Sequence, residues 1–212
     1  AMIASVQAWV NNPSSNQGWY IFSDSNSSRG DFASAENGTI ANRPQLTVDF
    51  IVPVAPTMDL DLDNSSGATG TEHRGSFVED GGAVRAVDTD ATLTAGSTNT
   101  MSGLTVTLSN RPNGTSEQLA ATAGTTPITV SYNSTNGVLT LSGAATLAQY
   151  QQVLRTVTYN NSSQNPDTTD RSLTVVLTDA YGQTATATST LSVSASNLSL
   201  IHISEPTRPL YI

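Results

Sequence analysis

Residues 128–143 read ITVSYNSTNGVLTLSG, and this stretch decides the fold class. Apolar and polar residues alternate on both sides of Asn136-Gly137, as they do in strands that bury one face. Because Asn and Gly both tolerate a positive φ, the pair favours a tight hairpin turn. The stretch therefore predicts two antiparallel strands, Ile128–Tyr132 and Val138–Ser142.

The composition of the whole chain also favours strands. Ser and Thr are abundant; Thr is β-branched, and Ser competes for backbone hydrogen bonds inside helices. The 212 residues include no Cys, which excludes a disulfide framework, a thiolate metal site and a thiol nucleophile. A net charge of −9 makes nucleic acid a poor partner. No apolar run approaches the length of a membrane span, so we expect no membrane insertion in this chain.

Short Thr- and Val-rich runs continue on both sides of the hairpin and are separated by Gly, Asn and Asp. They predict six further strands: Ser76–Glu79, Ala83–Val87, Leu104–Ser109, Val153–Asn160, Ser172–Asp179 and Thr184–Ser194. Tyr181-Gly182 is expected to turn the last hairpin. Strands of this number and spacing predict an all-β fold, a Greek-key sandwich.

One segment departs from the strand pattern. Thr146 and Gln149 have the spacing of a capping box, and Leu147, Tyr150 and Leu154 follow at helical intervals. We therefore expect a short helix, Leu147–Gln152, with Tyr150 in the core.

The chain is expected to contain two modules. Residues 53–56 form a Pro-rich linker, because Pro fixes φ and restrains the residue before it. Residues 57–195 hold the predicted sandwich. Residues 1–52 contain three alternating runs, Ser5–Val10, Gly18–Phe22 and Leu46–Ile51. Three strands cannot close a sandwich, so this piece is expected to be the C-terminal part of a truncated module.

Several sequence blocks of the second module resemble the cadherin-like repeats of large bacterial surface proteins. The resemblance covers about residues 59–193 and lies in Phe77-Val-Glu79, Val87–Thr94, Gly137–Gly143, Tyr150–Asn161 and Asn165–Thr169. It implies a calcium-supported cadherin- or immunoglobulin-like sandwich, joined in tandem to neighbouring repeats of the same chain. It also implies a structural or adhesive protein, extracellular or at the bacterial cell surface, with a surface protein or polysaccharide as a further partner. Ala95-Gly96-Ser97 stands where such repeats often carry a second Asp-x-Asp pair, so fewer ions are expected.

The first module is similar to the closing strands of the DNRLRE family. The similarity lies in Val6–Val10, Gly18-Trp19, Phe32–Glu36 and Arg43–Val48, with Ala35 in place of the usual Arg. It implies a jelly-roll module related to carbohydrate-binding domains. The alternative function is therefore a carbohydrate-binding accessory region of a secreted polysaccharide-active protein. Trp9, Trp19 and Tyr20 would then stack on sugar rings, although aromatic residues in such a fragment also fill cores.

The end of the chain has a different character. Residues 198–208 read LSLIHISEPTR, which resembles the translation of a common sequencing adapter. We therefore expect the tail, residues 196–212, to be an assembly artefact, and His202 carries no functional weight.

Acidic residues are the candidate metal ligands, because Ca²⁺ prefers six to eight oxygen ligands. The cadherin-like resemblance implies Glu79, Asp88, Asp90 and Asp179. The spacing of Asp59, Asp61 and Asp63 suggests the same chemistry, but it also fits an edge strand with Leu60 and Leu62 inward and solvated Asp side chains. Asp88 and Asp90 could likewise be ordinary turn carboxylates. An EF-hand is excluded, because Asn64 and Gly70 occupy loop positions six and twelve.

Catalysis has little support in the sequence. The chain has no Gly-x-Ser-x-Gly elbow, no phosphate-binding Gly loop and no His-Glu-x-x-His helix. His73 lies in a polar Gly-rich segment and is expected to be solvated. We therefore expect a non-catalytic protein.

Overall fold

The structure, a computed structural model, describes residues 7–9, 11–15, 38–39 and 52–196. The chain divides into two compact units, residues 1–50 and 51–212.

In the first unit, residues 7–9 and 11 are helical, and Pro13–Ser15 form the 3-10 helix η1. The predicted strand Ser5–Val10 is therefore wrong at its described residues. A backbone hydrogen bond of 2.9 Å from Asn12 to Ala8 closes a helical turn there, and Ala is the strongest helix former. The predicted strands Gly18–Phe22 and Leu46–Ile51 lie outside the described residues.

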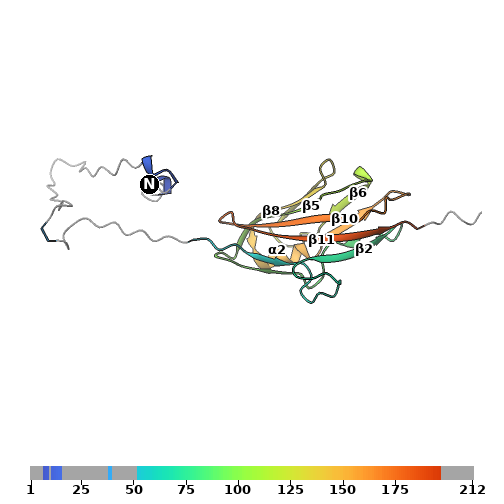
Figure 1. Cartoon of the computed structure of the whole chain (residues 1–212), viewed down its shortest axis with the longest axis horizontal. Coiled ribbons are helices and arrows are strands. Elements are labelled where there is room, and N and C mark those ends of the chain that lie inside the picture. Colours follow the sequence, from blue (N-terminus) through green and yellow to red (C-terminus); the bar gives the residue numbers. More distant parts are fainter. Residues whose placement is uncertain (1–6, 10, 16–37, 40–51, 197–212) are drawn as a thin grey trace, which may run out of the picture. The chain divides into compact units, whose positions relative to one another are not determined.

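The described part of the second unit, residues 52–196, is a β-sandwich with one short α-helix (Figure 1). Its larger sheet has the order β2-β11-β10-β5-β8-β7. The bounds of these strands are β2 His73–Val78, β5 Thr100–Leu108, β7 Thr129–Asn133, β8 Val138–Thr146, β10 Arg171–Asp179 and β11 Thr184–Ser194. Neighbouring strands in this sheet are antiparallel except β11 and β2, which are parallel.

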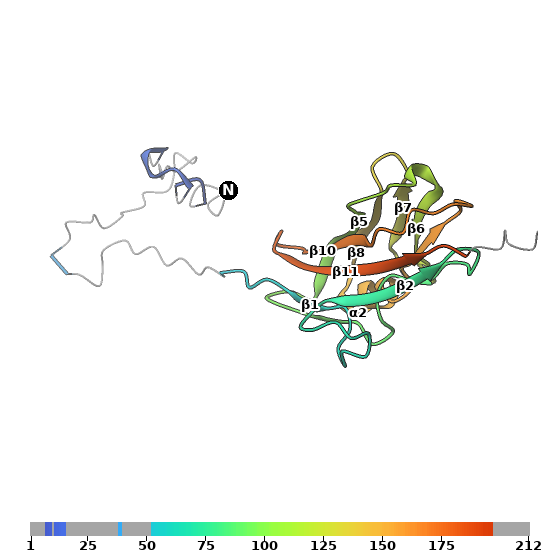
Figure 2. The same cartoon turned by 45° about the vertical axis from the view of Figure 1, so that its right-hand side comes forward.

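Two smaller sheets complete the sandwich (Figure 2). One has the order β3-β9-β6, with β3 Val84–Arg85, β6 Glu117–Ala120 and β9 Thr158–Asn161, and the 3-10 helix η3, Gly114–Ser116, leads into β6. The other pairs β1, Thr57–Asp59, with β4, Thr92–Thr94.

The core lies between the sheets and follows directly from the period of two. In β10, Leu173, Val175 and Leu177 are fully buried, and the residues between them face outward. Phe77 of β2 and Tyr159 of β9 meet edge to face, with ring centroids 5.4 Å apart. Each buried side chain of this size contributes about 1.5–3 kcal/mol to folding.

The hairpin predicted at Asn136-Gly137 is confirmed, although its turn is longer than expected. Asn133 pairs with Val138, which leaves four residues in the turn, and Gly137 has a φ of +73° whereas Asn136 is not in the positive-φ region. A side-chain hydrogen bond stabilises this longer turn: the Asn133 side chain accepts from the backbone N–H of Thr135 at 2.9 Å.

The helix α2, Leu147–Leu154, has the predicted capping box, in which the Thr146 hydroxyl accepts from the Gln149 backbone and the Gln149 side chain accepts from the Thr146 backbone. Tyr150 is fully buried, as predicted, and its hydroxyl donates to the carbonyl of Gly143 at 2.7 Å. The predicted strand Val153–Asn160 starts too early, because the helix continues through Leu154 and β9 begins only at Thr158.

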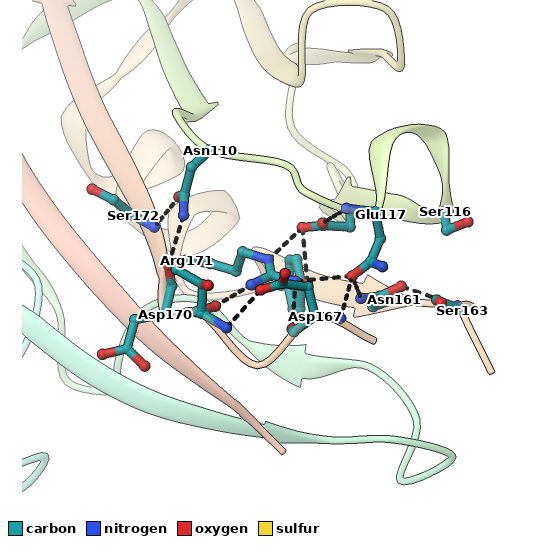
Figure 3. A network of polar contacts seen from close by, with 12 residues as sticks. Asn110, Ser116, Glu117, Asn161, Ser163, Asp167, Asp170, Arg171 and Ser172 are labelled. Atoms are coloured by element: carbon teal, nitrogen blue, oxygen red, sulfur yellow. Dashed lines mark hydrogen bonds and ion pairs between the residues drawn. The ribbon is translucent and has the colours of Figure 1, made fainter. Parts of the chain in front are cut away.

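A buried ion pair joins β6 and β10 (Figure 3). The Nε of Arg171 lies 2.8 Å from Oε2 of Glu117, and both side chains are fully buried. Asn113 accepts a hydrogen bond of 3.0 Å from Arg171, and Tyr159 donates one of 3.0 Å to Glu117. Burial and the Glu117 carboxylate both raise the pKa of Tyr159, so this phenol stays protonated as a donor.

Candidate metal centre

The run Asp59-Leu-Asp-Leu-Asp63 begins in a strand and then turns out of it. β1 ends at Asp59, Leu60 is fully buried, and Leu62 is 56% exposed. Asp61 is fully buried, so the run does not form an edge strand with both Leu side chains inward. That alternative is wrong, because the chain turns after Leu60 and brings Asp61 inward.

The Asp61 carboxylate organises the turn that follows it. It accepts hydrogen bonds from the backbone N–H groups of Ser65 at 3.1 Å and Ser66 at 3.0 Å, and from the Ser66 hydroxyl. Burial opposes ionisation of this side chain, but these hydrogen bonds outweigh it and hold the pKa of Asp61 below its usual value. Asp61 is therefore a buried carboxylate that remains charged.

Asp88 and Asp90 reach the same place from the turn between β3 and β4. The backbone N–H of Asp88 donates to the carbonyl of Leu60 at 3.0 Å, which fixes this turn against the acidic run. The Asp90 carboxylate accepts from the backbone N–H groups of Leu62 at 3.2 Å and Asp63 at 3.0 Å. The Asp90 carboxylate thus joins two segments nearly thirty residues apart in sequence, by accepting from backbone N–H groups of the other segment.

Three carboxylates converge at this point. One oxygen each of Asp61, Asp63 and Asp90 lies within 4.8 Å of the other two. Asp61 is buried, Asp90 is partly buried and Asp63 is exposed, so the group opens to solvent on one side. These three oxygen donors could hold a metal ion, and hard cations prefer such ligands.

Two further acidic residues border the group without joining it. Asp88 accepts a hydrogen bond of 3.4 Å from the Ser65 hydroxyl. Burial opposes its ionisation, but hydrogen bonds from Thr89 and Asp90 lower the pKa of Asp88. Asp59 accepts from the backbone N–H of Asp61 at 3.0 Å. Both residues therefore shape the backbone around the three carboxylates.

The helix α2 braces the turn that carries Asp90. Arg155, which follows the helix, donates to the carbonyl of Ala91 at 2.8 Å and to the carbonyl of Asp90 at 3.2 Å. Gln151 in the helix accepts from the backbone N–H of Leu93 at 2.9 Å.

Arg155 binds backbone carbonyls and not the carboxylates of the cluster. In the described part of the chain, the one ion pair is Glu117–Arg171, so the three carboxylates have no ion-pair partner there.

The structure does not bring Glu79 and Asp179 to this cluster. The two residues lie beyond opposite ends of β11, since Glu79 donates its N–H to Ser194 and Asp179 donates its N–H to Gln183. Ten residue steps in β11 correspond to about 33 Å. The four residues implied by the cadherin-like resemblance thus occupy three places, and only Asp88 and Asp90 lie near each other.

Glu79 and Asp179 each have local partners. A carboxylate oxygen of Glu79 accepts from the backbone N–H of Ser196 at 2.8 Å. Oδ1 of Asp179 accepts from the N–H groups of Tyr181 and Gln183, each at 2.8 Å, within the last hairpin turn. Oδ2 of Asp179 is buried and has no hydrogen-bond partner.

His73 is buried, which corrects the expectation that it is solvated. It is the first residue of β2, and its Nδ1 lies 2.9 Å from the hydroxyl of Ser189 on β11. Burial lowers the pKa of His73, although the nearby negative charges of Asp88 and Asp61 act in the opposite direction. The Gly-rich surroundings in sequence concealed a strand position, because Gly75 lies in the same strand as His73 and pairs with Leu191 of β11.

The aromatic residues of the first unit are described only in part. Trp9 lies in the helical segment and is partly buried, while Trp19 and Tyr20 lie outside the described residues. The stacking surface expected from these three residues therefore stays a prediction. Among the described residues, no helix has the length and apolar character that a membrane span requires.

No family model matches the chain, and no curated protein matches it.

Proposed function

We propose that this chain is a non-catalytic, calcium-binding structural module of a large extracellular bacterial surface protein. The observation that carries the proposal is the convergence of Asp61, Asp63 and Asp90 within 4.8 Å. The adhesive and extracellular parts rest on the cadherin-like sequence blocks, and the β-sandwich is compatible with them. Neighbouring repeats of the same chain are the proposed partners.

Calcium suits this group better than a smaller ion. Ca²⁺ accepts irregular arrangements of six to eight oxygens, whereas Mg²⁺ requires near-octahedral geometry and releases water reluctantly. Three carboxylates, one of them exposed, leave room for water or carbonyl ligands on the open side. The bound ion would offset the mutual repulsion of three like charges, so its binding would stabilise the folded state.

Isothermal titration calorimetry of the full chain with calcium tests the proposal. We expect the wild type to bind calcium and Asp90→Asn to bind at least about 10-fold more weakly, as expected when a metal ligand is weakened. Asp170→Asn is the matched control, because Asp170 is exposed and lies outside the cluster while the substitution removes the same charge. Absence of calcium binding by the wild type, or equal binding by the two variants, would contradict the proposal.

A further inference from the structure

The chain enters the sandwich at one end and leaves it at the other (Figure 1). At the first end, Val54 and Ser97 exchange two hydrogen bonds, of 3.0 Å and 2.7 Å. The β10–β11 turn lies at the same end, since Ala180 donates to Thr100 at 3.0 Å. β11 then runs the length of the unit to Ser194. Tension applied through the neighbouring segments would therefore act along the β11 axis.

Tension from the first end reaches the β1–β4 pair first and, once β1 is released, acts on β2 and β11. They are parallel, with register from His73–Ser189 to Val78–Ser194. Tension would pull β2 from its N-terminal end and β11 from its C-terminal end, in opposite directions along one axis. The ladder bonds are then loaded together, whereas strands pulled apart from one end lose them one after another.

Side-chain hydrogen bonds strengthen the same pair of strands. Four of them cross between β2 or the residue before it and β11: His73–Ser189 at 2.9 Å, Thr188–Glu72 at 3.2 Å, Ser194–Phe77 at 3.3 Å and Ser192–Gly75 at 3.4 Å. The two serine bonds end on backbone carbonyls of β2, so they add resistance to sliding in the direction of the strands.

Residues 61–70 form a loop between β1 and β2. The backbone N–H of Leu60 donates to the carbonyl of Thr71 at 3.1 Å, and this hydrogen bond closes the loop. Breaking this bond would release about 35 Å of extended chain. Asp61 and Asp63 lie in this loop, and Asp90 lies across from it. An ion bound by all three would hold the loop to the neighbouring turn.

We infer that this unit bears mechanical tension along the chain, with the β2–β11 pair as its clamp and the cation as a lock on loop 61–70. The lock rests on the proposed function, whereas the clamp depends only on the strand geometry.

Single-molecule pulling on the full chain tests the clamp, and the absence of Cys allows handles to be placed freely. Handles at Val54→Cys and Ser196→Cys load the two strands along their axis. Handles at Val78→Cys and Ser196→Cys peel them from one end. In EGTA, we expect a higher unfolding force for the first pair at the same loading rate. An equal or lower force would overturn the clamp.

Substitutions on β11 give a second, independent test with the first pair of handles. Ser192→Ala with Ser194→Ala removes two of the bonds to β2 and leaves the backbone ladder intact. Thr184→Ala with Thr186→Ala changes two exposed residues of the same strand that lie beyond the register with β2. We expect a loss of unfolding force in the serine variant alone. The same force in both variants would count against the clamp.

The lock is tested with the first pair of handles in EGTA and in calcium. In EGTA, we expect loop 61–70 to add about 35 Å to the extension that precedes rupture of the β2–β11 pair; calcium should remove this addition, and Asp90→Asn should restore it. If calorimetry shows calcium binding and this addition persists in calcium, the lock is overturned. If calorimetry shows no binding, the proposed function and the lock both fail, and the comparison of handle pairs in EGTA still decides the clamp.

Discussion

At the scale of single residues, Asp61 and Asp63 have different tasks although they are two positions apart. Asp61 is buried and accepts hydrogen bonds from Ser65 and Ser66, whereas Asp63 is exposed and its carboxylate accepts one, from Ser65. An Asn at position 61 would place its amide N–H₂ against the backbone N–H of Ser65 or of Ser66, and two donors cannot bond to each other. We therefore expect Asp61→Asn to lower the metal-free stability by about 1–3 kcal/mol.

Asp63→Asn is the comparison for this prediction, since it is expected to weaken calcium binding while leaving metal-free stability nearly unchanged. Urea unfolding in EDTA measures the stability of both variants. If the two variants lose equal stability in EDTA, Asp61 does not organise the turn in the way its hydrogen bonds indicate.

The Glu117–Arg171 pair shows how costly one unpaired charge would be in this core. Arg171→Met leaves the Glu117 carboxylate buried without its cation, so we expect a loss of about 3–5 kcal/mol in the free energy of unfolding. Replacing Glu117 by Met as well removes the stranded charge and should restore part of the loss. Urea denaturation of the two single variants and the double variant measures this, and additive losses would contradict it.

His73 makes the metal-free protein sensitive to mild acid. Burial holds the pKa of His73 below its unfolded value of 6.5. As the pH falls, the unfolded chain therefore binds a proton on His73 before the folded protein does. The contribution of neutral His73 to the free energy of unfolding is complete above pH 6.5 and is lost as the pH falls through the folded-state pKa. Urea unfolding in EDTA at about pH 7.5 and about pH 5.5 should show this loss. The loss should shrink in His73→Gln, and an equal loss there would assign it to other groups.

At the scale of elements, the capping box stabilises the first turn of α2, the helix whose Gln151 contacts the segment that follows Asp90. Thr146→Ala removes the acceptor for the Gln149 backbone N–H, which costs about 1 kcal/mol in typical helices. That corresponds to about 2–4 °C in Tm for a chain of this size. Thr146→Ser keeps the hydroxyl and should retain the wild-type Tm in thermal melts. If Ser and Ala lower Tm equally, the hydroxyl is not the stabilising group.

The elements that could be predicted from sequence are those with a clear period. The predicted Thr184–Ser194 matches β11, and the predicted Ser172–Asp179 lies within β10, because apolar and hydroxyl residues alternate over most of each strand. β4 and β6 were beyond prediction, since three or four residues are too short to show a period. The boundary of α2 was misplaced because Val153 and Leu154 suit a strand and a helix equally well.

The sequence predicts the individual ligands of the candidate site but not that they meet. The spacing of Asp59, Asp61 and Asp63 indicates one acidic segment, and the cadherin-like resemblance indicates Asp88 and Asp90 in the other. Their meeting depends on the backbone bond from Asp88 to Leu60, a tertiary contact that no local pattern encodes. The cadherin-like resemblance grouped Glu79 and Asp179 with them, and sequence order does not show which ends of different strands lie at the same end of the sandwich.

At the scale of the whole molecule, negative charge is concentrated in the sandwich. Residues 57–195 contain twelve acidic and five basic side chains, a net charge of −7, whereas residues 1–52 carry −2. Self-repulsion of this kind destabilises the compact state. A cation bound by Asp61, Asp63 and Asp90 would relieve the repulsion at the point where the carboxylates are closest.

The calcium proposal is tested most directly by differential scanning calorimetry of the full chain in calcium and in EDTA. At a free calcium concentration of about 100 times Kd, binding adds about 2.7 kcal/mol, which corresponds to a rise of about 5–10 °C in the Tm of the sandwich. Asp90→Asn should lose this rise, and Asp170→Asn should keep it. A wild-type Tm that is the same in excess calcium and in EDTA would contradict the proposal.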